Sequence, residues 1–156
     1  MATRSNICLV LNKEDIGKVM KFDESKLPKN VTCDNKFLDK VEEVVLEKPI
    51  LEIYHHWDGY PEGVGKTLLS QYNDYNAILN LLLGGSASSI FENNVCQYCA
   101  WRGEDWEYVK PRQLDEPSLD EEYLYKFENG TWYFIDVYEN ESWVNLNEYL
   151  NAHKEG

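Results

Sequence analysis

The sequence predicts an α+β domain: a mainly antiparallel sheet with two or three helices packed on it. Two apolar runs, residues 5–11 and 50–55, have the composition of strands. The dipeptide Asn129-Gly130 separates two further strand-like runs and predicts a hairpin, because a type I′ turn needs positive φ at both central positions. A chain of 156 residues is the size of one ordinary domain, so we predict a single domain spanning residues 1–156.

The first third of the chain is predicted to hold one buried strand and a long polar excursion. Residues 5–11 are nearly all apolar after Asn6, which favours a strand covered on both faces. Residues 12–35 are mostly polar, with a short strand predicted at 18–22. Asp34 is a candidate cap for a helix whose apolar stripe continues to Val45, and Pro49 would end it.

The middle and the end of the chain alternate between predicted helices and strands. After the strand at 50–55 we predict a helix over residues 63–72, and a second helix that Asp74 caps and Gly84-Gly85 ends. A last helix is predicted over 145–153. The remaining predicted elements are strands at 94–101, 105–109, 122–127 and 131–137, a small-residue turn at 86–89 and an acidic loop at 111–117.

The sequence is strongly acidic, with 28 acidic residues against 15 Lys and Arg and a formal net charge of −13. Residues 102–156 carry 14 acidic and 5 basic residues, whereas residues 1–101 carry 14 and 10. Such a surface repels a phosphate backbone, so we predict no nonspecific nucleic-acid binding. A basic partner protein, or solubility alone, fits the charge better.

The sequence carries no targeting or membrane signal. No apolar stretch follows Met1-Ala2-Thr3-Arg4, and no apolar run approaches the roughly 20 residues that a membrane-spanning helix needs. We therefore expect a cytoplasmic protein without membrane association, in which the four cysteines are reduced. The oligomeric state is left open.

Residues 54–61, Tyr-His-His-Trp-Asp-Gly-Tyr-Pro, lie between a predicted strand and a predicted helix. Glycine and proline here favour a sharp turn, and Asp58-Gly59 is common turn chemistry. Trp57 and Tyr60 combine a large apolar body with a polar group, as binding surfaces often require. We predict a rigid strand-to-helix corner with Trp57, Asp58 and Tyr60 as candidate ligand-binding residues.

The run Gly63-Val64-Gly65-Lys66-Thr67 resembles part of a phosphate-binding loop. The first glycine of that motif would stand at Tyr60, and Pro61 beside it lacks the N–H that cradles phosphate. We therefore interpret the run as a helix start with an exposed Lys66. A weaker version stays open, in which Lys66 and the backbone N–H groups of the helix start meet an anion.

Cys96 and Cys99 have the two-residue spacing of a zinc half-site, but the sequence lacks the second pair that a four-ligand structural site uses. His55 and His56 are adjacent on a strand and so point to opposite faces. We predict no metal and no cofactor, with Cys96 and Cys99 as the candidate ligands if a metal is bound.

Two further groups of residues are candidates for chemistry. His56 and Asp58 could serve as an acid/base pair in a hydrolase, although no nucleophile–base–orienter pattern accompanies them. Arg102 is one of three arginines and is followed by Glu104. Its guanidinium is expected to pair with a carboxylate of the protein, or alternatively to bind a ligand phosphate or carboxylate.

Several separated motifs occur together in this chain: Ala2-Thr3-Arg4-Ser5, His56-Trp57-Asp58-Gly59-Tyr60-Pro61, Val64-Gly65, Leu68-Leu69, Tyr72, Tyr98, Arg102-Gly103-Glu104 and Glu122-Tyr123-Leu124-Tyr125 before the Asn-Gly hairpin. Together they resemble a family of small, functionally uncharacterised proteins of bacteriophages, prophages and bacteria. Similar proteins carry a further Arg and Asp before Arg-Gly-Glu, where this chain has Ala100 and Trp101. Residues 12–48 fall outside the resemblance, which suggests a family-variable insertion. The resemblance implies a phage-linked setting and no particular activity.

These observations together predict a non-enzymatic accessory protein of phage or prophage type, acting on host physiology or defence. It would bind a small polar, nucleotide-like ligand or a host protein. The candidate ligand-binding residues are Trp57, Asp58, Tyr60, Lys66, Arg102 and Glu104, and we expect most of them to meet in one pocket. Two alternatives stay open: a hydrolase that uses His56 and Asp58, and an acidic inhibitor that binds a basic surface through its last 55 residues.

Overall fold

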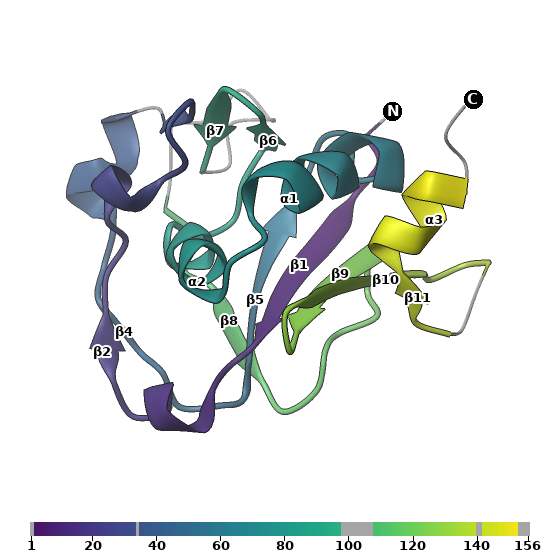
Figure 1. Ribbon diagram of the computed structural model, residues 1–156. Coiled ribbons are helices and arrows are strands. Elements are labelled where there is room, and N and C mark those ends of the chain that lie inside the picture. Colours follow the sequence, from purple (N-terminus) through teal and green to yellow (C-terminus); the bar gives the residue numbers. More distant parts are fainter. Residues whose placement is uncertain (1, 34, 98–107, 140–141, 153–156) are drawn as a thin grey trace.

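A six-stranded sheet with the strand order β11-β10-β9-β1-β5-β8 forms the centre of the structure (Figure 1). The structure, a computed structural model, describes residues 2–33, 35–97, 108–139 and 142–152. Only β1 and β9 pair in parallel within this sheet, and the other four pairs are antiparallel. The strands are β1 (Ser5–Val10), β5 (Ile50–His55), β8 (Arg112–Leu114), β9 (Tyr123–Glu128), β10 (Thr131–Asp136) and β11 (Val144–Asn145). The predicted α+β class with a mainly antiparallel sheet is confirmed.

Three helices cover one face of this sheet (Figure 1): α1 (Lys66–Gln71), α2 (Tyr75–Leu83) and α3 (Leu146–Ala152). Successive side chains of a strand point to opposite faces, so alternate strand residues face these helices. Ile7 and Leu9 of β1 accordingly join the main core under the helices, whereas Cys8 belongs to a smaller cluster with Ile50 and Leu124. Both faces of β1 are therefore covered, as its apolar sequence predicts.

The connection between β8 and β9 passes over the face of the sheet that the helices leave uncovered. β8 and β9 lie on opposite sides of the β1–β5 pair, so the chain must cross both strands between Leu114 and Tyr123. Ser118 and Asp120 of this connection contact side chains of β5 and β1. Polar residues of the two central strands are thereby closed off from solvent.

Two small sheets and short helical turns complete the fold. β2 (Val19–Met20) pairs with β4 (Val44–Val45), and β7 (Asn94–Cys96) lies between β3 (Thr32–Cys33) and β6 (Ser89–Phe91). The 3₁₀ turns are η1 (Lys13–Asp15), η2 (Glu24–Lys26) and η3 (Asn35–Lys40). Residues 12–48 pack on the main core through Phe22, Val31 and Val41, so this segment shares the core of the rest.

Several predicted elements are confirmed in place. The strand at Ile50–His55 has the predicted bounds. The Asp74 side chain caps α2 by accepting a hydrogen bond from Ala77 N at 3.2 Å. Asn129 and Gly130 have φ values of 51° and 81°, as the type I′ hairpin requires.

Among the described residues, no helix has the length and apolar character to cross a membrane.

Other predicted elements are wrong. The helix predicted to continue to Val45 is the 3₁₀ turn η3, which ends at Lys40, and Val44–Val45 forms β4 instead. Two adjacent β-branched residues pack well on a pleated surface, and β2 supplies the partner strand. The predicted loop at 111–117 contains β8, and the predicted turn at 86–89 leads into β6. Residues 108–109 carry no strand, and most of the predicted strands at 94–101 and 105–109 lies outside the described residues.

Candidate functional site

The corner after β5 is held by a short segment that extends the sheet. Ala87 N donates to Tyr54 O at 2.9 Å, and His56 N donates to Ala87 O at 3.1 Å. Trp57 N then donates to Ser88 O at 2.9 Å. Backbone pairing therefore continues past the end of β5 and fixes where Trp57 leaves the sheet.

Asp58 reverses the chain at this corner. Its φ of 56° lies in the left-handed region, which Asp tolerates better than most residues. Its carbonyl oxygen accepts a hydrogen bond from Val64 N at 2.9 Å. A Cβ at Gly63 would lie 2.4 Å from that oxygen, so the close approach requires glycine. The turn at Asp58 is thereby joined to the π-helical turn η4 (Pro61–Gly65), which continues into α1.

Gly59 ties the corner to the segment before β1 and to β9. Its N–H donates to Thr3 O at 2.9 Å, and its carbonyl accepts from the Tyr125 hydroxyl at 2.6 Å. A Cβ at Gly59 would lie 2.7 Å from Thr3 O, so a larger residue does not fit. Burial raises the pKa of Tyr125 well above its usual value, which keeps the hydroxyl protonated as a donor. The predicted rigid corner thus has a physical basis in backbone contacts.

The two histidines have different environments below the corner. His55 is buried, and its Nδ1 lies 3.2 Å from Ser5 Oγ. Burial, with a smaller effect of His56, lowers the pKa of His55 to about 3, so its ring is neutral at pH 7. His56 is also buried, with Nδ1 2.7 Å from the Tyr54 hydroxyl and its ring edge-on to Trp57 at a centroid distance of 4.7 Å. These contacts fix the ring of His56 beneath Trp57.

A pocket of about 250 Å³ opens between the start of the α1 helix and the β6–β7 turn. Among the described residues, Asp58, Glu62 and Glu92 bring three carboxyl groups to its lining, and Lys66 brings one cation. Trp57 and Tyr60 on either side of Asp58 are 42% and 38% exposed. We call this region the corner surface. Its exposed side chains are Trp57, Asp58, Tyr60, Glu62, Lys66, Phe91 and Glu92.

The structure therefore brings together part of the predicted binding site. Asp58 and Lys66 line the same pocket, whereas Trp57 and Tyr60 are exposed neighbours of Asp58 in the chain that are not among its lining residues. Arg102 and Glu104 lie outside the described residues, so their predicted place in this pocket stays a prediction. Phe91 and Glu92 are additional residues that the sequence did not single out.

The structure also bears on three alternative interpretations of the sequence: an anion site at the helix start, an acid/base pair and a metal site. The N–H groups of Gly63 and Val64 donate to Tyr60 O and Asp58 O, so they are not directed at an anion in the pocket. His56 is 6% exposed and is not among the residues that line the pocket beside Asp58. Within the described part of the chain, no group of three or more His, Cys, Asp or Glu side chains could hold a metal ion. Cys99 lies outside that part.

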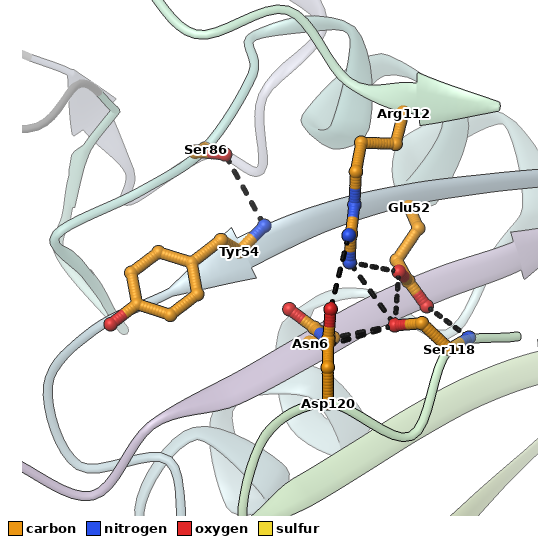
Figure 2. Close-up of polar contacts among 7 residues, drawn as sticks. All are labelled: Asn6, Glu52, Tyr54, Ser86, Arg112, Ser118 and Asp120. Atoms are coloured by element: carbon orange, nitrogen blue, oxygen red, sulfur yellow. Dashed lines mark hydrogen bonds and ion pairs between the residues drawn. The ribbon is translucent and has the colours of Figure 1, made fainter.

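Sequence reasoning missed a buried polar network on the face of the sheet away from the helices (Figure 2). Glu52 of β5 is completely buried, and Arg112 Nη2 of β8 lies 2.5 Å from its Oε2. Ser118 donates to Glu52 twice, from Oγ at 2.7 Å and from its backbone N at 3.2 Å. Arg112 also contacts Asp120 at 3.2 Å. Asn6 Nδ2 donates to Ser118 Oγ at 3.1 Å and to Asp120 Oδ1 at 2.5 Å.

The charges in this network shift one another's pKa values. Burial raises the pKa of Glu52, and the contacts from Ser118 and Arg112 only partly offset this. Burial acts against the charged form of Arg112, but Asp120 and Glu52 outweigh it and raise the pKa of the guanidinium. Burial likewise raises the pKa of Asp120, yet donors from Arg112, Ser118 and Asn6 bring it below its usual value. Arg112 is therefore the group that compensates a buried carboxylate.

One signal in the sequence could have located this network. Glu52 is a charged residue inside the apolar run Ile50-Leu51-Glu52-Ile53. A fully buried Glu is almost always paired, and this acidic chain has few arginines to provide a partner. Arg102 was predicted to pair with an unspecified carboxylate of the protein; among the described residues, Arg112 pairs with Glu52.

Comparison of the chain with protein-family models, with curated proteins and with solved structures finds no match in any of the three. The evidence for a function therefore comes mainly from the geometry and charge of the described residues.

Proposed function

We propose that the protein is a non-enzymatic binding protein whose corner surface engages a basic segment of a partner protein. The observation that carries this proposal is the pocket beside Trp57, where three carboxyl groups and one lysine line the same cavity. The formal charge of this lining is −2, from three acidic side chains and one basic one. An arginine or lysine side chain of a partner would complement this negative charge.

The exposed aromatic residues support a protein as that partner. Trp57, Tyr60 and Phe91 are 42%, 38% and 47% exposed. Aromatic side chains are enriched in protein interfaces, and a guanidinium or ammonium group binds well over their faces. Trp57 is also pre-positioned by its contact with the ring of His56, which lowers the entropy lost on binding.

The same charges disfavour the nucleotide-like ligand at this pocket. A phosphate group would lie near Asp58, Glu62 and Glu92, and among the described lining residues Lys66 is the only cation. The negative phosphate and these carboxylates would repel one another, and this repulsion is stronger in a recess of the protein than in open water. The resemblance of the His-Trp-Asp-Gly-Tyr-Pro motif to phage and prophage proteins favours a host protein as the partner.

The proposal is tested with a fluorescein-labelled peptide of alternating arginine and glycine, titrated with the protein and followed by fluorescence anisotropy. Trp57→Ala is expected to weaken binding at least tenfold, as truncating a central aromatic residue of an interface often does. Asp58→Asn keeps a residue that tolerates positive φ and should weaken binding about three- to tenfold, with a flatter dependence on salt.

Two matched controls separate a specific surface from general acidity. Tyr138→Ala removes an aromatic side chain that is 76% exposed elsewhere, and Glu116→Gln removes an exposed carboxylate of the acidic connection. Neither control should change the affinity by more than about twofold. If the controls weaken binding as much as Trp57→Ala and Asp58→Asn do, the peptide is held by net charge alone and the proposal is wrong.

The hydrolase remains the alternative function, although the geometry gives it less support. His56 is buried and its Nδ1 is engaged with the Tyr54 hydroxyl, so substrate access to it needs a rearrangement. A hydrolase would lose product formation in His56→Ala while the variant stays folded. The binding protein would show no turnover in either form.

A further inference from the structure

We infer that a second, separate pocket, built on Asn6 at the far face of the sheet, binds a small zwitterion of the α-amino-acid type. This pocket of about 210 Å³ is distinct from the corner surface and shares no lining residue with it. It is smaller than the 300–1,000 Å³ typical of sites for drug-sized ligands, so its occupant is a small molecule. Its lining residues are Asn6, Tyr54, Ser86, Val109, Lys110, Arg112, Asp120 and Glu121.

The orientation of the Asn6 side chain is fixed by its neighbours. Asn6 is 1% exposed, and its Nδ2 lies against Asp120 Oδ1 and Ser118 Oγ. An ionised carboxylate can only accept hydrogen bonds, so the amide nitrogen must face Asp120 and the amide oxygen must face away. Figure 2 shows that oxygen turned away from Ser118 and Asp120, on the side of Tyr54.

The Asn6 oxygen has no donor among the described residues. Buried acceptors are almost always satisfied, and leaving one without a donor destabilises the protein. The pocket next to it is where a ligand N–H or O–H group can supply the missing hydrogen bond. This oxygen therefore specifies one property of the ligand: it carries a donor.

The charged groups around the pocket indicate which charges the ligand carries. Asp120 and Glu121 are acidic, and Lys110 and Arg112 are basic. A simple anion would meet the two carboxylates, and a simple cation would meet the lysine and the guanidinium. A zwitterion satisfies both pairs, with its ammonium near the carboxylates and its carboxylate near the cations.

The remaining walls fit the same ligand. Arg112 uses Nη2 for Glu52 and Ser118 and Nη1 for Asp120, so only part of its five N–H donors is engaged by these contacts. Ser86 Oγ accepts from Tyr54 N at 3.3 Å, which leaves its hydroxyl proton available for an acceptor group of the ligand. The donors of the cationic side and the acceptors of the acidic side thus surround one small cavity.

The experiment is a thermal melt of the full chain with each of the twenty free amino acids at pH 7, followed by calorimetric titration of those that raise the Tm. At ten times Kd the Tm should rise by about 3–5 °C. Acetate and methylammonium, each carrying one half of the zwitterion, should leave the Tm unchanged at the same concentration. If no amino acid raises the Tm or gives a binding isotherm, or if acetate is as effective as the best amino acid, the inference is wrong.

Variants assign the binding to this pocket. Lys110→Gln and Glu121→Gln change side chains at its rim and should weaken the amino-acid affinity at least fivefold. Lys48→Gln removes a surface lysine elsewhere, which pairs with Asp115 at 3.6 Å, and should leave the affinity unchanged. Equal affinity in all three variants would place the binding at another site and contradict the inference. Because the corner surface is unaltered in these variants, their result does not depend on its proposed function.

Discussion

Replacing Arg112 with methionine tests the ion pair between Arg112 and the buried Glu52. Arg112 Nη2 lies 2.5 Å from a carboxylate oxygen of Glu52, whose side chain is 0% exposed. Removing one partner of a buried ion pair typically costs about 3–5 kcal/mol, because an uncompensated charge stays buried. Ser118 would still donate two hydrogen bonds to Glu52, and the Arg112 side chain is itself 45% exposed. We therefore expect the free energy of unfolding to fall by an amount at the lower end of this range, about 3 kcal/mol.

The assay is urea unfolding followed by tryptophan fluorescence, which the five tryptophans of the chain provide. For a domain of this length, a loss of about 3 kcal/mol corresponds to a Tm decrease of about 6–12 °C. The matched control is Lys48→Met. Lys48 pairs with Asp115 at 3.6 Å on the surface, and such pairs contribute only about 0–1 kcal/mol.

The loss in Arg112→Met should also depend on pH. Burial raises the folded-state pKa of Glu52 above the ordinary 4.5, and removing Arg112 takes away an influence that lowers it. A carboxyl group with a raised folded-state pKa binds its proton more tightly in the folded state, so acidification favours the folded variant relative to the wild type. The difference should shrink as the pH falls below that pKa. A cost equal to that of Lys48→Met, or a difference independent of pH, would refute the role assigned to Arg112.

Three further substitutions test the corner and its supports. His55 has a folded-state pKa of about 3 against 6.5 in the unfolded state, so the unfolded state binds one more proton between these pH values. The free energy of unfolding of the wild type therefore rises with pH in this range, and His55→Leu should reduce that slope between pH 4 and 6 by up to about 1.4 kcal/mol per pH unit. An unchanged slope, measured by urea unfolding at several pH values, would contradict this. Gly59→Ala should lower the Tm by several degrees in a thermal melt, because its Cβ would lie 2.7 Å from Thr3 O, and a wild-type Tm would mean that the contact relaxes freely. Tyr125→Phe should cost about 1–2 kcal/mol in urea unfolding through loss of its 2.6 Å hydrogen bond to the Gly59 carbonyl, whereas Tyr138→Phe, at a residue 76% exposed, should cost nothing measurable.

Elements encoded by short-range signals were predictable from the sequence. The strand Ile50–His55 is an apolar run ended by turn residues, and Asn129-Gly130 has the chemistry of its turn. Asp74 caps α2 as its residue type predicts. In each of these cases the determining residues are neighbours in the chain.

Elements that depend on a distant partner were not predictable. β8 is only three residues long and lies in an acidic, proline-containing segment, so its strand character comes from pairing with β5 about sixty positions earlier. Val44 and Val45 fit a helical apolar stripe as well as a strand, and pairing with β2 decides between the two. Local propensity is a weak prior where tertiary contacts differ.

The corner was predictable in position, but the charge of the pocket beside it was not. The motif around Trp57 and Asp58 marked the corner, since a turn rich in aromatic residues follows a buried strand. The third carboxyl group of its pocket comes from Glu92, which the β6–β7 turn brings beside Asp58 across more than thirty residues. The residue pattern within one segment does not indicate that the turn at Asp58 and the β6–β7 turn lie side by side.

The most direct test of the corner surface is a map of backbone amide chemical shifts of the ¹⁵N-labelled protein during titration with the arginine–glycine peptide. Binding at the corner surface predicts the largest shifts at residues 57–66 and 90–92, with small shifts in the acidic connection 115–122. The largest shifts at residues 115–122 would instead support the acidic inhibitor that acts through its last 55 residues. That result, or the absence of shifts at residues 57–66, would contradict the proposal that Trp57 and Asp58 form the binding surface.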